Sequence, residues 1–203
     1  MSMGVVSVAT MTLWKSGALL LYAVLFAYVA PWHLPVDAWW TWAVANLGVD
    51  FFFYWAHRVA HRVRLVWATH QAHHSSEYFN FATALRQKWN NSAEIVAWLP
   101  LPLLGVPPAL VFLGFSISLV YQFFVHTERV DRLFGSFQPE LHRPTYGLTT
   151  RVGTHRIVRL QTHEYASIVR DVRRTPRLRD KLGYVFGPPG WQPDTAPADT
   201  CPV

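Results

Sequence analysis

The feature that most restricts the fold of this chain is a set of apolar segments with the length of membrane-spanning or membrane-embedded helices. They cover residues 12–31, 38–56, 93–104 and 109–125. A helix of about 20 apolar residues matches the hydrocarbon core of a bilayer. Inside lipid the backbone must satisfy its own hydrogen bonds, which favours helices. The sequence therefore predicts an all-α, multi-pass membrane protein with about four transmembrane or membrane-embedded helices.

The first apolar segment has a second interpretation, as a cleaved signal peptide. It is long for the apolar part of such a peptide, and the stretch from Ala27 to Pro31 offers no good cleavage pattern. Lys15 interrupts the segment, but a lysine near the end of a span can extend toward the interface. We therefore interpret this segment as a span.

The last two apolar segments are separated by Gly105-Val-Pro-Pro108, which predicts a tight turn and a helical hairpin. The first arm is short and contains Pro100 and Pro102. Such an arm can enter the bilayer and turn back without crossing it. Whether it crosses fully stays open at this point.

The distribution of basic residues predicts the topology. The connection between the second and third segments contains Arg58, Arg62, Arg64, Arg86 and Lys88, whereas Pro31–Asp37 has no Lys or Arg. By the positive-inside rule, this connection and both termini are cytoplasmic. The net charge of +6 is also typical of nucleic-acid binders, but the basic residues flank apolar runs and form no long run. We therefore expect a membrane partner and no nucleic acid.

The domain organisation follows from the same pattern. We expect one membrane domain over residues 1–191, in which residues 127–191 form a histidine-containing helical cap on the cytoplasmic side. Residues 192–203 are rich in Pro, Asp and Thr and predict a disordered tail. The single cysteine, Cys201, excludes an intrachain disulfide.

Histidines carry the chemistry that the sequence suggests. His57 and His61 are four residues apart and therefore lie on one face of a helix, where two imidazoles can bind one metal ion. His70, His73 and His74 also lie on one face. One pair alone would be weak evidence, because surface helices carry paired histidines by chance. Two clusters nine residues apart, directly after a predicted span, indicate a metal centre.

The helix face that carries His57 and His61 also carries polar residues of the second apolar segment. Asp50 and Tyr54 lie on the same helix face, seven and three residues before His57. A carboxylate near a metal-binding histidine can accept its second N–H and orient the ring. The alternative is that Asp50 caps or pairs with a group at the membrane interface, and both readings stay open.

These residues resemble sequence motifs of a known family. The stretch from Asp50 to His61 resembles the first histidine box of the fatty acid hydroxylase and sterol desaturase superfamily, and His70-Gln-Ala-His73-His74 resembles its second box. The continuation through Glu77, Asn80 and Thr83–Arg86 is similar to the branch that contains alkylglycerol monooxygenase. Phe124–Glu128 and Asp131–Phe137 resemble later elements of the family.

The resemblance implies a function and a set of site residues. It implies an iron-dependent oxidoreductase, di-iron in the family, that hydroxylates or desaturates a lipid with dioxygen. It adds His126 to the five clustered histidines as a metal ligand, and Glu128 to Asp50 and Tyr54 as a supporting residue. Electrons would come from an external reductase or carrier, because the sequence has no Gly-rich dinucleotide motif.

The chain departs from the family pattern in one place. Between Val130 and Asp131 the family has several tens of residues with a third histidine box, which supplies further metal ligands, and this chain has none of them. His142, His155 and His163 are single histidines, and we do not expect them to replace that box. Two alternatives to an active oxygenase therefore stay open: an inactive, internally shortened family member, and a metal-binding or transport protein.

Overall fold

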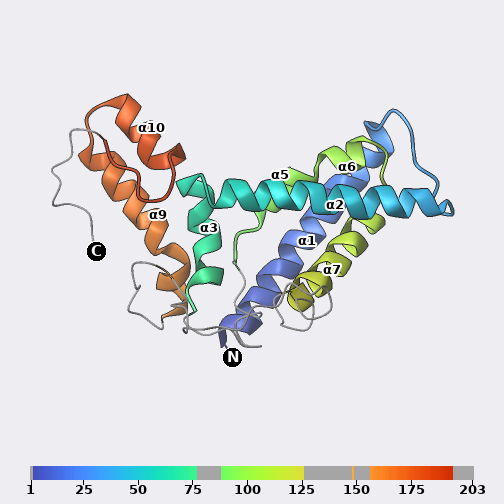
Figure 1. The fold of residues 1–203 in the computed structure, drawn as a ribbon, viewed down its shortest axis with the longest axis horizontal. Helices are drawn as coiled ribbons and strands as arrows, with labels where there is room; N and C mark the ends of the chain where they lie inside the picture. The colour runs from blue at the N-terminus through green and yellow to red at the C-terminus, as the bar shows by residue number, and fades with distance from the viewer. Residues whose placement is uncertain (1, 77–87, 126–147, 149–155, 194–203) are drawn as a thin grey trace, which may run out of the picture. The chain divides into compact units, whose positions relative to one another are not determined.

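The structure of the chain is a computed structural model that describes residues 2–76, 88–125, 148 and 156–193 (Figure 1). Every regular element among these residues is a helix, and no strand occurs in them, which confirms the all-α prediction. The chain divides into two compact units. One contains Met1–Met11, His57–Asn91 and Thr145–Val203, and the other contains Thr12–Ala56 and Ser92–Pro144.

The apolar segments form helices α1 (Ser2–Tyr28), α2 (Trp39–Ala60), α5 (Ser92–Trp98), α6 (Pro100–Leu103) and α7 (Pro108–Val125). α1 begins ten residues before the predicted span, because residues 2–11 contain no proline and Gly4 is their one glycine, so no residue there strongly opposes a helix. It ends at Tyr28, shortly before Pro31, whose ring disfavours helical geometry in the preceding residue.

α1 is the one helix in the described part of the chain that is long and apolar enough to cross a membrane, over Gly4–Tyr28. The hairpin arm Ser92–Leu103 would be about 18 Å long as one helix, well short of a hydrocarbon core of roughly 30 Å. Its short length agrees with the expectation that this arm can turn back. The count of four membrane helices stays a prediction.

The second unit has an apolar core built from α1, α2 and the hairpin. The core includes Tyr22, Val49, Val111 and Phe115, all less than 5% exposed. The Tyr22 hydroxyl donates a 2.6 Å hydrogen bond to the Ile95 carbonyl oxygen, so α1 is tied to α5 by a polar contact as well. Lys15 Nζ lies 4.8 Å from the centroid of the Phe115 ring, a cation–π contact that accommodates the charge within α1.

The turn between α6 and α7 depends on Gly105. Its φ of +79° lies in the left-handed region that favours glycine. A Cβ at this position would lie 2.3 Å from the Trp32 carbonyl oxygen. The Gly105 carbonyl accepts a 2.9 Å hydrogen bond from the Leu34 N–H, and the Trp32 Nε1–H donates to the Leu104 carbonyl at 3.0 Å. The predicted tight turn is therefore present, and the 31–35 connection packs directly against it.

The first unit is built on three helices, α3 (Arg64–His74), α9 (Ile157–Arg174) and α10 (Leu178–Phe186). Each of the three contacts the other two (Figure 1). Trp191 folds back on α10, with its ring centroid 5.2 Å from that of Tyr184. The predicted cap therefore contains a helical pair that packs on the helix with the second histidine cluster.

Candidate metal centre

The two histidine clusters come together because α2 ends where the chain turns back. α2 runs through Ala60, which places His57 in its last turn, and the His61 N–H still bonds to the His57 carbonyl at 3.2 Å. Only Arg62 and Val63 separate His61 from the start of α3. A connection this short keeps the end of α2 beside α3 and brings histidines from both helices into contact.

Four of the predicted ligands form one group: His57, His61, His70 and His74. Each offers one ring nitrogen, and these nitrogens all lie within 4.8 Å of one another. Within α3, His70 Nε2 lies 3.0 Å from His74 Nε2. At the end of α2, His61 Nε2 lies 3.2 Å from His57 Nε2. Between the two helices, the ring centroids of His57 and His70 are 4.7 Å apart, and those of His61 and His74 are 4.8 Å apart.

These separations suit a transition-metal ion. With metal–nitrogen bonds of about 2.0–2.1 Å, neighbouring ligand nitrogens are about 2.9 Å apart in an octahedral site and about 3.4 Å apart in a tetrahedral one. The two pairs, at 3.0 and 3.2 Å, fall in this range. The largest separation, 4.8 Å, exceeds the roughly 4.2 Å between opposite ligands, so the rings must close by a few tenths of an ångström around an ion.

The electrostatics favour neutral imidazoles. Burial lowers the pKa of His70 far below its usual value, and the charges of Lys88 and the neighbouring histidines lower it further. Burial also lowers the pKa of His74 to about 4, with repulsion from His73, His61 and His57 as the lesser cause. Burial lowers the pKa of His61 as well. Near neutral pH these rings therefore have the unprotonated nitrogens that metal binding requires.

Trp67 forms one wall of the histidine group. Its ring stacks on that of His74 with centroids 5.6 Å apart, and lies 5.2 Å from that of His61. Trp67 precedes His70 by three residues and His74 by seven, so the helical period already places it on their face. His70 is buried while His61 is exposed, which leaves the group open to solvent on the α2 side.

Of the remaining predicted site residues, the structure describes three: His73, Asp50 and Tyr54. His73 lies beside the group but outside it, with its ring centroid 5.3 Å from that of His74. Asp50 and Tyr54 lie in the second unit, on the exposed surface of α2. The roles of these three residues stay predictions. His126 and Glu128 lie outside the described residues, as do His142 and His155.

Two other histidines contact their own chain locally. His163 Nδ1 lies 3.2 Å from the carbonyl oxygens of Arg159 and Leu160 in its own helix. His33 Nε2 lies 2.6 Å from the Phe26 carbonyl oxygen. Neither belongs to the group of four.

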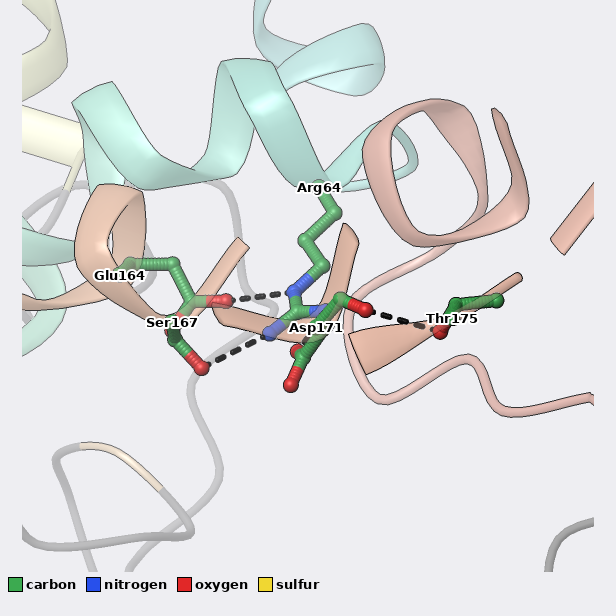
Figure 2. A network of polar contacts seen from close by, with 5 residues as sticks. All are labelled: Arg64, Glu164, Ser167, Asp171 and Thr175. Carbon is green, nitrogen blue, oxygen red and sulfur yellow. Dashed lines mark hydrogen bonds and ion pairs between the residues drawn. The ribbon is translucent and has the colours of Figure 1, made fainter. Parts of the chain in front are cut away.

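Sequence reasoning missed the residue that attaches α3 to the cap. The positive charge of Arg64 bears on the predicted topology, yet Arg64 is only 7% exposed. Its guanidinium makes three contacts to α9 (Figure 2). Nε donates to Glu164 at 2.7 Å, one Nη donates to Ser167 at 3.1 Å, and the other pairs with Asp171 at 2.8 Å. The spacing of Glu164, Ser167 and Asp171 on one helix face was the available signal.

Burial alone would lower the pKa of Arg64, but its hydrogen bonds and ion pairs with Glu164 and Asp171 raise it instead. The guanidinium is therefore charged and compensated within the protein. Since Arg64 is the first residue of α3, and His70 and His74 lie on the same helix, this network connects the position of the histidines to α9.

Comparison with known proteins places these residues in a family. The family model for "Fatty acid hydroxylase" matches residues 42–168, which include all four histidines of the group. The chain is 34% identical to alkylglycerol monooxygenase of Danio rerio in an alignment 216 positions long, gaps included. This alignment covers 83% of this chain and 48% of the relative. The chain is 32% identical to alkylglycerol monooxygenase of Homo sapiens over 231 residues, 95% of this chain and 52% of the relative.

The chain thus spans about half the length of the curated relatives that it matches. The alignment with the human protein extends over 231 positions although this chain has 203 residues, so that relative contains at least 28 residues with no counterpart here. No solved structure matches the chain. The match of the family model over both histidine clusters, together with the two relatives, shows that this chain belongs to the fatty acid hydroxylase family.

Proposed function

We propose that this chain is a membrane-bound, iron-dependent oxidoreductase that hydroxylates or desaturates a lipid with dioxygen. The observation that carries the proposal is the group of four histidines from α2, the turn after it and α3, within the segment that matches the fatty acid hydroxylase family. The relatives at 32–34% identity are monooxygenases named for a lipid substrate. They support a fatty acyl, alkylglycerol or sterol-like substrate.

In this proposal the protein residues hold and orient the metal. His57, His61, His70 and His74 supply imidazole nitrogens at separations that fit one ion, and His73 and His126 are the further predicted ligands. Imidazole-rich sites with open positions suit iron, which supplies the dioxygen chemistry needed to oxidise an unactivated C–H bond. Asp50, Tyr54 and Glu128 are the proposed supporting residues, with the role of orienting ligand rings.

The proposed setting is the membrane, with lateral entry of the lipid and an external electron donor. Several large apolar side chains on α1, α2 and α7 are exposed, including Leu13, Leu20, Leu47, Phe51 and Val120. Exposure of many large apolar side chains on several helices is typical of contact with lipid. Together with the apolar length of α1, it supports membrane insertion, for which we propose four membrane helices and a cytoplasmic metal centre.

A second candidate function is that of a family member that binds metal with little or no oxygenase activity. The observation that favours it is the internal shortening of this chain relative to its relatives, which agrees with the missing third histidine box after Val130. Loss of ligands that hold a metal directly should cost more than the 10–100-fold typical of loss of their supporting partners. We therefore expect weak lipid oxidation by this chain.

The test compares the full chain with a variant that has a family third box inserted between Val130 and Asp131. Both are placed in membranes with iron, a reductase system and candidate lipids, and oxidised lipid is measured by mass spectrometry. We expect little product from the chain and more from the variant, abolished in both by His70→Ala. Equal product from the two would refute the impaired alternative, and the absence of product from both would refute the oxygenase proposal.

A further inference from the structure

α9 has two opposite faces with opposite charge. Its inner face carries Glu164 and Asp171, both bonded to Arg64 (Figure 2). Ile168 of the same helix is buried. Its outer face is centred on Val169 and Arg173, about half a helical turn away. Because the inner face is held by the Arg64 network and by packing on α3, the outer face is presented in a defined orientation within this unit.

The outer face borders an open hollow of about 700 Å³. The described residues that line it recur at helical spacing along α9, and all except the half-buried Tyr165 are exposed: Thr162, Tyr165, Ala166, Val169, Arg170, Arg173 and Arg174. Ligand-binding clefts are typically about 300–1,000 Å³. The hollow is therefore large enough for part of a small molecule, and too open to enclose one completely.

Three arginines make this hollow cationic. Arg170, Arg173 and Arg174 are neighbours at helical offsets of three and four, where like charges repel. In the part of the chain that the structure describes, no acidic side chain lies within ion-pair distance of any of the three. From Arg156 to Lys181 there are eight basic and three acidic residues, and Arg64 already neutralises two of the acidic ones. The positive charge of the three guanidinium groups therefore attracts an anion to this face.

The other lining groups indicate which anion. Asn90 Nδ2 donates a 3.3 Å hydrogen bond to the Tyr165 hydroxyl oxygen, so the hydroxyl hydrogen can be donated to a ligand oxygen. Guanidinium groups match the oxygens of a phosphate with paired N–H donors. Ala166, Val169 and the Tyr165 ring add an apolar surface next to these donors. Phosphate beside apolar surface is the chemistry of a phospholipid headgroup.

We propose that the outer face of α9 binds the phosphate of an anionic membrane phospholipid. Arg170, Arg173 and Arg174 hold the phosphate, the Tyr165 hydroxyl donates to it, and Val169 packs against the glycerol and the first acyl carbons. A lipid accounts for the apolar surface better than free phosphate or an acidic protein does, and the chain has an apolar helix of membrane-spanning length. This site does not depend on the metal centre.

The test measures binding of dihexanoyl-phosphatidylglycerol to the full chain in detergent by isothermal titration calorimetry. The variant Arg170→Gln/Arg173→Gln/Arg174→Gln is compared with a control, Arg177→Gln/Arg179→Gln/Lys181→Gln, which removes the same charge from the adjoining segment outside the hollow. We expect the dissociation constant to rise at least about tenfold in the first variant and less than about threefold in the control. Dihexanoyl-phosphatidylcholine should bind at least about tenfold more weakly to the unchanged chain.

Other outcomes would overturn the proposal. Equal weakening in both triple variants would mean that only net charge matters. Inorganic phosphate that binds as tightly as the lipid would indicate a free anion as the ligand, and binding of polyglutamate in place of the lipid would indicate an acidic protein. If the triple variant fails to fold by circular dichroism, Arg173→Lys decides. It keeps the charge but loses the paired donors, so unchanged affinity would refute phosphate recognition by the guanidinium.

Discussion

At the scale of residues, the candidate metal centre consists of four imidazoles, and burial lowers the pKa of three of them, His61, His70 and His74. His70 is 6% exposed, and its burial and the charge of Lys88 both disfavour a positive charge on its ring. A neutral imidazole in such a place is either a packed core residue or a metal ligand. The proximity of three more ring nitrogens within 4.8 Å favours the second role.

We expect His70→Ala to lower the affinity of the chain for Fe²⁺ or Co²⁺ by about 10-fold or more, since it removes a direct ligand. Isothermal titration of the metal into metal-free protein measures this. The control is His163→Ala, because His163 bonds to carbonyl oxygens of its own helix and does not belong to the group. Equal loss in both variants would contradict the assignment of His70.

The pKa shifts predict how the stability of the metal-free protein depends on pH. His70 and His74 have lowered pKa values in the folded state, about 4 for His74, and ordinary values near 6.5 when unfolded. Below pH 6.5 the unfolded chain binds protons that the folded chain does not, so the free energy of unfolding should fall as the pH falls from about 6.5 to 4. Thermal unfolding in a chelator between pH 7.5 and 4.5 measures it, and His74→Gln should reduce the slope. A flat profile would mean that these rings are not buried as described.

At the scale of elements, two connections position the histidines. The short link between α2 and α3 brings the clusters together, and Arg64 ties the first turn of α3 to α9. The guanidinium is nearly buried and interacts with two half-buried carboxylates, so its removal leaves two partly desolvated negative charges without this partner. Such a change usually destabilises more than the loss of a surface ion pair.

We expect Arg64→Ala to lower the free energy of unfolding by about 3 kcal/mol and to weaken metal binding as well. The control variant Arg62→Ala removes an exposed arginine two residues earlier and should change stability by less than about 0.5 kcal/mol. Denaturant unfolding followed by circular dichroism gives both values. If Arg64→Ala is as stable as Arg62→Ala, the network in Figure 2 contributes little.

The hairpin between α6 and α7 yields a second prediction at this scale. Gly105→Ala places a side chain at a φ of +79° and against the Trp32 carbonyl oxygen, so it should destabilise by about 1–3 kcal/mol. Gly17→Ala is the matched control, because Gly17 lies within α1 and a Cβ there meets nothing within 4 Å. It should be neutral or slightly stabilising, since alanine favours a helix. Comparison of thermal midpoints in detergent distinguishes the two, and equal midpoints would contradict the turn.

At the scale of the whole molecule, the number of ligands limits the number of metal ions. The described residues bring together four ring nitrogens, and the further predicted ligands are His73, from the second cluster, and His126, which the family resemblance adds. Six nitrogens can fill one octahedral site or leave two sites open. The chain therefore has fewer ligands than a family member with a third histidine box.

We expect the purified full chain to bind one transition-metal ion tightly and a second one weakly or not at all. Elemental analysis of protein dialysed against metal-free buffer measures this ratio. The chain with a third box inserted after Val130 is the control and should retain close to two ions. Two tightly held ions in the unmodified chain would show that other residues, such as His142 or His155, have been recruited as ligands.

The sequence by itself determined the helical class, the break at Gly105 and the two histidine pairs. Each of these depends on local spacing or on the backbone preferences of Gly and Pro. Both can be read from the amino-acid sequence without knowledge of the tertiary contacts. It also indicated the family, because the histidine boxes are local motifs.

Tertiary structure decided which residues meet across helices. His57 and His70 are thirteen positions apart and Arg64 and Glu164 a hundred apart, and no helical period relates either pair. The packing of α3 against α9 assigned Arg64 an internal role that its charge alone did not suggest. It also set His73 outside the group, although His70, His73 and His74 share one helix face in the sequence. The described ring contacts from α3 to His57 and His61 include those of His70 and His74.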